Sequence, residues 1–227
     1  MKRRRRGAVR DQSDSAFSAI LGRLCDDSGA LAAALVDGEG ETVDYAGLLS
    51  PYEVKVAAAE WRIVLRVVRE SRLPGFHSVS MLTVRAKGRT FVIEAMPDGY
   101  AIAACLPQHA FNISRRALGQ AIRELAHEAG IALPEARAQV HWARVTLRTP
   151  TGSRLYRRPD AIWLHDAWSP LTILGRYQAR DLSHSELGYL ARLASGAEVF
   201  LVREPLGVWF IDNAAVLGLS GPGAAFG

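Results

Sequence analysis

Residues 50–71, which read SPYEVKVAAAEWRIVLRVVRES, give the strongest indication of how this chain folds. The hydroxyl of Ser50 can accept a hydrogen bond from the amide of Glu53, and the Glu53 side chain can reach back to the Ser50 amide. Pro51 occupies the first helical position, where its missing N–H costs nothing. The stretch therefore predicts a helix that begins at residue 51 and ends near Ser71.

This predicted helix is apolar over much of its circumference. Its main apolar face comprises Val54, Ala57, Ala58, Trp61, Val64, Leu65 and Val68, with Val56, Ile63 and Val67 beside it. A helix with so much apolar surface is expected to pack against other elements on two sides. We expect it to pack against the sheet of its own domain on one side and against a second subunit on the other. The alternative is that the helix packs on its own sheet alone.

The residues before this helix predict another helix and two strands. Apolar residues recur with helical spacing at Phe17, Ile20, Leu21 and Leu24, and Ser13 or Asp14 can cap that helix. Residues 30–37 and 42–46 are short strand-like runs joined by the glycine turn 38–40. The segment from 13 to 46 therefore has the predicted order helix, strand, strand.

The residues after residue 71 predict a three-stranded meander and a last helix. Strand patterns cover 78–86, 90–96 and 100–106, separated by turns at 87–88 and 97–99. Ser114 can cap a helix with Leu118, Ile122, Leu125 and Ala129 on one face, and Gly130 is suited to end it. The whole order, helix-strand-strand-helix-strand-strand-strand-helix, predicts an α+β domain over residues 13–132 with a five-stranded antiparallel sheet.

This order resembles the roadblock/dynein-light-chain family, whose fold is profilin-like. The matching residues are Ala19-Ile20-Leu21-Gly22-Arg23-Leu24 and Ala30-Leu31-Ala32-Ala33-Ala34-Leu35-Val36-Asp37-Gly38-Glu39-Gly40. They correspond to the family's leading helix that ends in leucine, its first strand with a terminal aspartate, and its glycine turn. The resemblance covers roughly residues 13–130, and the alanine-rich first strand departs from it.

The resemblance implies a function that is not catalytic. Members of the family, including MglB-type polarity proteins of bacteria, form homodimers or heterodimers through the second helix and third strand, and they regulate or carry Ras-like GTPases. On this chain the implied dimer or partner interface comprises Val54, Ala57, Ala58, Trp61, Val64, Leu65, Val79, Met81 and Thr83. The implied partners are a second copy, a related roadblock protein, or a Ras-like GTPase.

Residues 138–220 predict a second small α+β domain of no recognised type. Strand patterns occur at 140–148, 161–164, 171–174, 198–203 and 207–212. Ser183-His184-Ser185-Glu186 resembles a capping box, and Leu187, Leu190, Ala191 and Ala194 then predict a helix that Gly196 ends. An extension of the first sheet and a degenerate repeat of the first domain stay open as alternatives.

Charge and composition narrow the class of protein. The 227 residues carry a formal net charge of +5, and lysine occurs only at positions 2, 55 and 87, so the basic residues are nearly all arginine. Heavy use of arginine and alanine is typical of GC-rich bacterial genomes. Residues 1–12 form a predicted disordered basic tail with no apolar core of a signal peptide, and no apolar run approaches the roughly 18 residues that span a bilayer. We expect a cytoplasmic protein.

Motifs for catalysis, metals and cofactors are weak throughout. Cys25 and Cys105 are far apart in apolar patterns, and the histidines show no metal-ligand spacing with other ligands. Gly38-Glu39-Gly40-Glu41 lacks the lysine of a phosphate loop. We therefore expect that the chain is not an enzyme and that it holds no metal and no cofactor.

The alternative function is nucleic-acid binding by the basic tail and by the region rich in arginine and aromatic residues. In that region Trp142, Tyr156, Trp163, Trp168 and Tyr177 lie among arginines.

Overall fold

The computed structural model describes residues 10–108, 110, 112–134, 142–150, 158–177, 186–204 and 207–212. The chain divides into two compact units, residues 1–138 and 139–227. Each unit has a hydrophobic core of its own.

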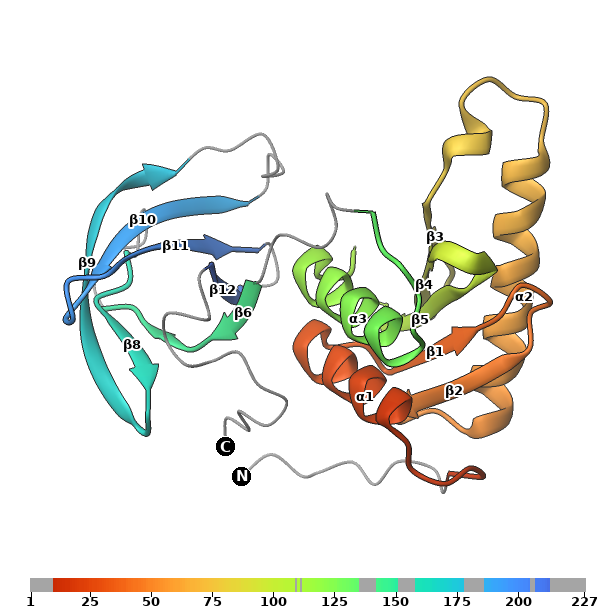
Figure 1. Cartoon of the computed structure of the whole chain (residues 1–227), viewed down its shortest axis with the longest axis horizontal. Coiled ribbons are helices and arrows are strands. Elements are labelled where there is room, and N and C mark those ends of the chain that lie inside the picture. Colours follow the sequence, from red (N-terminus) through yellow and green to blue (C-terminus); the bar gives the residue numbers. More distant parts are fainter. Residues whose placement is uncertain are drawn as a thin grey trace. The chain divides into compact units, whose positions relative to one another are not determined.

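The first unit has the element order that the sequence predicts. Its elements are α1 (Ala16–Ser28), β1 (Ala32–Val36), β2 (Thr42–Gly47), α2 (Pro51–Glu70), η1 (Phe76–Ser78), β3 (Met81–Arg85), β4 (Arg89–Ala95), η2 (Pro97–Gly99), β5 (Ala101–Pro107) and α3 (Arg115–Glu128). The strands form one antiparallel sheet in the order β2-β1-β5-β4-β3. Helices α1 and α3 pack together on one face, and α2 covers the other (Figure 1). The predicted α+β fold with a five-stranded antiparallel sheet is thus confirmed.

Hydrogen bonds at the helix ends explain where the helices begin. Ser50 accepts from the Glu53 amide at 3.3 Å and the Glu53 carboxylate accepts from the Ser50 amide at 3.2 Å, as predicted. The cap of α1 is Ser15, because its hydroxyl accepts from the Ser18 amide. The prediction of Ser13 or Asp14 for that cap is wrong.

The two faces of the sheet carry side chains of different size. Beneath α2 the strands present mainly Ala32, Ala34, Ala101 and Ala103, with Ile93. The residues that alternate with them, facing α1 and α3, include Leu35, Ile102, Leu106 and Val92. The small side chains under α2 shape the site described below.

The two edges of the sheet also differ. Arg10 donates hydrogen bonds to the Tyr45 carbonyl and to the buried carboxylate of Asp44, and its guanidinium lies 4.8 Å from the Tyr45 ring centroid. The Asp11 amide donates to the Tyr45 hydroxyl at 3.0 Å. These contacts cover the β2 edge. Arg10 and Asp11, which were predicted to belong to the disordered tail of residues 1–12, are bound there instead.

The opposite edge is formed by β3. This strand pairs with β4 on one side. Its other side carries no strand of the described chain, so a row of backbone N–H and C=O groups remains available for pairing there.

The described part of the second unit consists of strands. They are β6 (Trp142–Val145), β7 (Leu147–Arg148), β8 (Ala161–Leu164), β9 (Ala167–Tyr177), β10 (Leu187–Leu193), β11 (Glu198–Arg203) and β12 (Trp209–Asp212). Their order is β6-β12-β11-β10-β9-β8-β7. Only Thr146 separates β6 from β7, so the two ends of the sheet are one continuous segment, and the sheet closes into an antiparallel barrel.

The helix predicted over residues 187–194 is wrong, because this segment is strand β10. Tyr189, Ala191 and Leu193 point into the barrel core, while Arg192 between them is exposed. This alternation has the period of a strand, whereas the helical interpretation relied on leucine and alanine spacing alone. The repeat hypothesis loses its basis with the helix. The predicted strands at 161–164 and 198–203 are confirmed.

Candidate docking surface on helix α2

A row of apolar side chains on α2 is exposed. Tyr52, Val56, Ile63 and Val67 follow one another at helical spacing, and 76% of Tyr52, 47% of Ile63 and 59% of Val67 is accessible to solvent. Val64 is exposed beside them. We call these five exposed residues the outward face of α2; two of them, Tyr52 and Val56, also line the groove described below.

The residues predicted for the interface lie mostly elsewhere on this helix. Val54, Ala58 and Leu65 are buried against the sheet of their own unit, and Ala57 and Trp61 are half-buried. Of the six α2 residues that were predicted for the interface, only Val64 is exposed. The three buried residues therefore belong to the core, which is a correction to the predicted interface.

The predicted strand residues are divided between two faces of the sheet. Leu82 packs on the core beneath α2, and Val79 packs there from the segment before β3. Because side chains alternate along a strand, Met81 and Thr83 point to the face opposite Leu82. Met81 and Thr83 therefore do not lie on the same face of the sheet as the helix part of the predicted interface.

The prediction from the sequence did not include Tyr52, and it placed Val56, Ile63 and Val67 beside the interface rather than in it. The sequence does show that Lys55, Arg62 and Arg69 form a charged stripe between the two apolar sides of the helix. A helix with two apolar sides does not reveal from its own pattern which side meets the sheet.

Charges are divided along the length of α2. Glu53 and Glu60 lie in its first half, together with Lys55, which is paired with Asp11. Arg62, Arg66 and Arg69 lie in its second half, together with Glu70 at its end. Arg62 donates to the carbonyls of Asp37 and Gly99, which ties the helix to two turns of the sheet; its burial lowers its pKa. The first half of α2 is therefore net acidic and the second half net basic.

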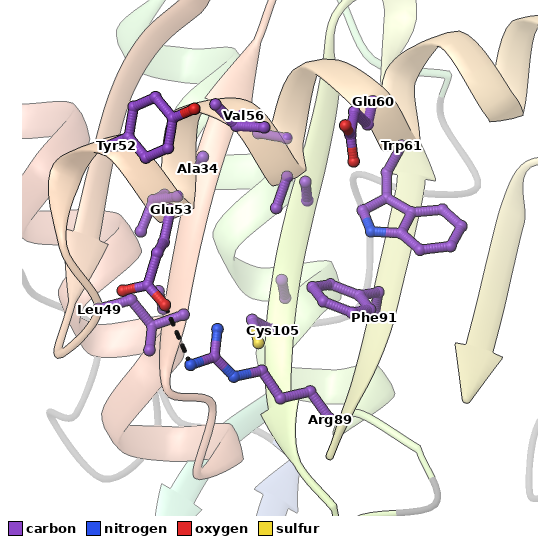
Figure 2. Close-up of a pocket in the computed structure, with 16 residues that line it drawn as sticks. Ala34, Leu49, Tyr52, Glu53, Val56, Glu60, Trp61, Arg89, Phe91 and Cys105 are labelled. Atoms are coloured by element: carbon purple, nitrogen blue, oxygen red, sulfur yellow. Dashed lines mark hydrogen bonds and ion pairs between the residues drawn. The ribbon is translucent and has the colours of Figure 1, made fainter. Parts of the chain in front are cut away.

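A groove of about 250 Å³ runs between the first half of α2 and the sheet (Figure 2). Its floor includes Ala32 and Ala34 of β1 and Ala103 and Cys105 of β5. Trp61 of α2 stacks on Phe91 of β4 with ring centroids 5.2 Å apart and planes 30° apart. Most of the lining is therefore apolar or aromatic.

The mouth of the groove carries charge. The Arg89 guanidinium lies 3.2 Å from the Glu53 carboxylate (Figure 2). Hydrogen bonds from Ser50, and then Arg89, hold the pKa of Glu53 below its usual value. Burial raises the pKa of the Cys105 thiol on the groove floor.

The described residues contain no group of three or more His, Cys, Asp or Glu side chains arranged to hold a metal ion. His77, His127 and His165 are exposed on separate elements, and His109, His141 and His184 lie outside the described residues. Within the same part of the chain, no helix is long and apolar enough to cross a membrane.

The second unit exposes an aromatic pair on the hairpin of β8 and β9. Trp163 and Trp168 pair edge to face across the strands, with ring centroids 5.3 Å apart and planes 72° apart. The Arg148 guanidinium lies 5.7 Å from the Trp168 ring centroid and is paired with Asp160 at 3.1 Å. Tyr189 and Trp209 fill the barrel core instead, whereas Tyr156 and the side chain of Tyr177 lie outside the described residues.

Comparison with known proteins relates about half of the chain to solved structures. Myxococcus xanthus MglB is 15% identical, with a TM-score of 0.46 over 52% of this chain and 98% of MglB. A roadblock/LC7 domain from Streptomyces avermitilis is 15% identical, with a TM-score of 0.41 over 52% and 96% of the two chains. The gliding protein MglB from Thermus thermophilus is 13% identical, with a TM-score of 0.40 over 52% and 94%. The C-terminal part is unmatched. No protein-family profile and no curated protein matches the sequence.

Proposed function

We propose that this chain is a non-enzymatic scaffold or regulator whose first unit docks proteins on the outward face of α2. The observation that carries the proposal is the exposed row of Tyr52, Val56, Ile63 and Val67. A contiguous apolar patch on a folded surface is typical of a protein-interaction site. The acidic and basic ends of α2 supply charged groups on either side of that patch, as in the polar rims of protein interfaces.

The first partner in this proposal is a second copy of the chain. The β3 edge is open and the β2 edge is covered by the segment around Arg10, so a sheet that continues into a second copy would do so at β3. Antiparallel pairing of α2 with its mate sets Glu53 and Glu60 of one copy against Arg66 and Arg69 of the other. Opposite charges at those positions favour that arrangement over a parallel one.

Engineered cysteines test the pairing through β3. Thr83 is the central residue of β3, so a two-fold axis at this strand brings Thr83 of both copies together. Thr83→Cys is expected to form a crosslinked dimer under mild oxidation, and Thr42→Cys on the covered β2 edge is the matched control. Equal crosslinking at both positions, or none at Thr83, would overturn pairing at β3. Both native cysteines are buried and leave the background low.

The second partner in this proposal is a Ras-like GTPase, which the resemblance of residues 19–24 and 30–40 to the roadblock family suggests. A purified bacterial Ras-like GTPase, loaded with GDP or with a non-hydrolysable GTP analogue, serves as the probe in a binding titration. We expect binding that depends on the bound nucleotide and is lost when Tyr52 and Val56 are changed to serine. Binding that survives this change would place the GTPase elsewhere, and absence of binding in both nucleotide states would count against a regulator of that probe's class.

A second candidate function is nucleic-acid binding by the barrel. The exposed Trp168 with Arg148 above its ring is the observation that favours it, because aromatic and guanidinium groups stack on unpaired bases. The pairing of Arg148 with Asp160 weakens this candidate, since a carboxylate repels phosphate. A salt-dependent gel shift with single-stranded RNA, lost in Trp168→Ala, would support it; no shift at low salt would exclude it.

A further inference from the structure

The groove beneath α2 exists because the sheet residues under the helix are small. Ala32, Ala34 and Ala103 stand where the opposite face of the same strands carries Leu35 and Ile102. On the helix side the nearest residues include Ala57 and Ala58. Alanine facing alanine leaves space that larger side chains would fill.

This space is accessible from outside rather than sealed. Its lining includes exposed residues, namely Tyr52, Glu53, Val56 and Glu60, as well as buried alanines. An empty apolar space forfeits contacts with the atoms that line it. A ligand that enters from the mouth can recover these contacts without unfolding the unit.

The groove is lined by three aromatic side chains and two carboxylates. Tyr52, Trp61 and Phe91 supply the rings, and Figure 2 shows Trp61 turned toward Phe91 below the helix. Of the carboxylates, Glu53 is bound to Arg89, whereas Glu60 forms no ion pair within the described part of the chain. Carboxylates thus outnumber cations by one in a chain whose overall charge is positive.

We propose that this groove is a binding site for a small organic cation with an aromatic or apolar body. The body would occupy the space over Ala34 and Ala103, against the rings of Trp61 and Phe91. The cationic group would remain at the mouth near Glu60, where both a carboxylate and aromatic faces attract positive charge. An anion of the same shape would meet two carboxylates, Glu53 and Glu60, and a single cation, Arg89. The volume of about 250 Å³ suits a ligand of about two fused rings, below the size of most drug sites.

A series of three probes with one aromatic body tests the charge preference. Tryptamine is a cation, indole is neutral and indole-3-acetate is an anion. Ligand-observed NMR on the full chain would give their dissociation constants. We expect tryptamine to bind on the order of 1 mM, as ligands of this size do without optimisation. Indole should be about threefold to fivefold weaker, the effect of one exposed charge pair, and indole-3-acetate weaker still.

Variants locate the site and distinguish it from general adsorption. Glu60→Gln is expected to reduce tryptamine binding to the level of indole, whereas Glu70→Gln, in the last turn of the same helix, should leave it unchanged. Ala57→Leu fills the groove from the helix side and should abolish binding of all three probes while the melting temperature stays the same or rises.

Three results would overturn the proposal. They are no binding of tryptamine at millimolar concentration, tighter binding of indole-3-acetate than of tryptamine, and unchanged binding in a folded Ala57→Leu protein. The proposed dimer sets Glu60 of one copy against arginines of the other, so the probes are titrated at a protein concentration at which sedimentation velocity shows a single copy. The Thr83→Cys crosslink measures dimerisation separately.

Discussion

The double substitution Ile63→Gln with Val67→Gln separates the docking role of α2 from its structural role. Both side chains are about half exposed in a single copy, at 47% and 59%. Glutamine is a good helix former of similar length, so the change removes apolar surface without breaking the helix. Away from the core such surface changes alter the free energy of unfolding by no more than about 0.5 kcal/mol.

The expected effect on self-association is much larger. Fully burying a side chain of this size is worth roughly 1.5–3 kcal/mol, so covering the exposed half of each residue contributes about 1 kcal/mol. Two residues on each of two copies therefore contribute about 4 kcal/mol to a symmetric dimer, or about three orders of magnitude in Kd. Sedimentation velocity over a concentration series, with urea unfolding of the same samples, measures both quantities.

Leu65→Ala is the matched control on the opposite side of the same helix. Leu65 is fully buried in the core between α2 and the sheet. Its truncation should lower the free energy of unfolding by about 2–5 kcal/mol. The reasoning is refuted if Leu65→Ala is tolerated while the double glutamine variant unfolds, because α2 would then face the other way. A double variant that associates as strongly as the native chain would show that the outward face is not used.

Other consequences of the structure can be measured on the isolated chain. Arg10→Ala leaves the buried Asp44 carboxylate without its ion-pair partner and should lower the free energy of unfolding by about 2–3 kcal/mol; a loss below about 0.5 kcal/mol in urea would contradict the assigned role. His165 and Asp166 both have positive φ at the β8–β9 turn, so His165→Asn with Asp166→Gly should stabilise the barrel by about 1–2 kcal/mol, seen as a higher thermal midpoint. Burial raises the pKa of Cys25 to about 12 from an ordinary 9.0, so the native state keeps a proton that the unfolded state releases. Stability should therefore fall between pH 9 and 12 by up to about 1.4 kcal/mol per pH unit, and Cys25→Ala should remove that part of the slope.

Local signals accounted for most of the first unit. The capping residues Ser50 and Glu53, the turn at 97–99 and the alternation in residues 90–96 act over a few neighbours along the chain, and the structure has them as predicted. The docking surface was predicted less well: Val64 is exposed, whereas Val54, Ala58 and Leu65 are in the core. The groove was not predicted, because the residues of α2 and of the strands that line it are in places more than 20 positions apart along the sequence.

The second unit shows where a local pattern misleads. Residues 187–194 satisfy a helical spacing of leucine and alanine, yet β10 pairs with β9 on one side and β11 on the other. Hydrogen bonds to two neighbouring strands and burial of Tyr189, Ala191 and Leu193 in the barrel outweigh the intrinsic helix preference of the segment. That competition depends on strands that are distant in the sequence.

The order of amino acids was enough to predict most helix ends, the turns, the succession of elements in the first unit and the amount of apolar surface on α2, since each depends on neighbours within a few positions. Three outcomes required the folded chain: which side of α2 meets the sheet, which sheet edge is covered, and that β6 and β7 close a barrel. They follow from the burial and pairing of residues far apart along the chain, and such interactions leave no periodic trace in either partner alone.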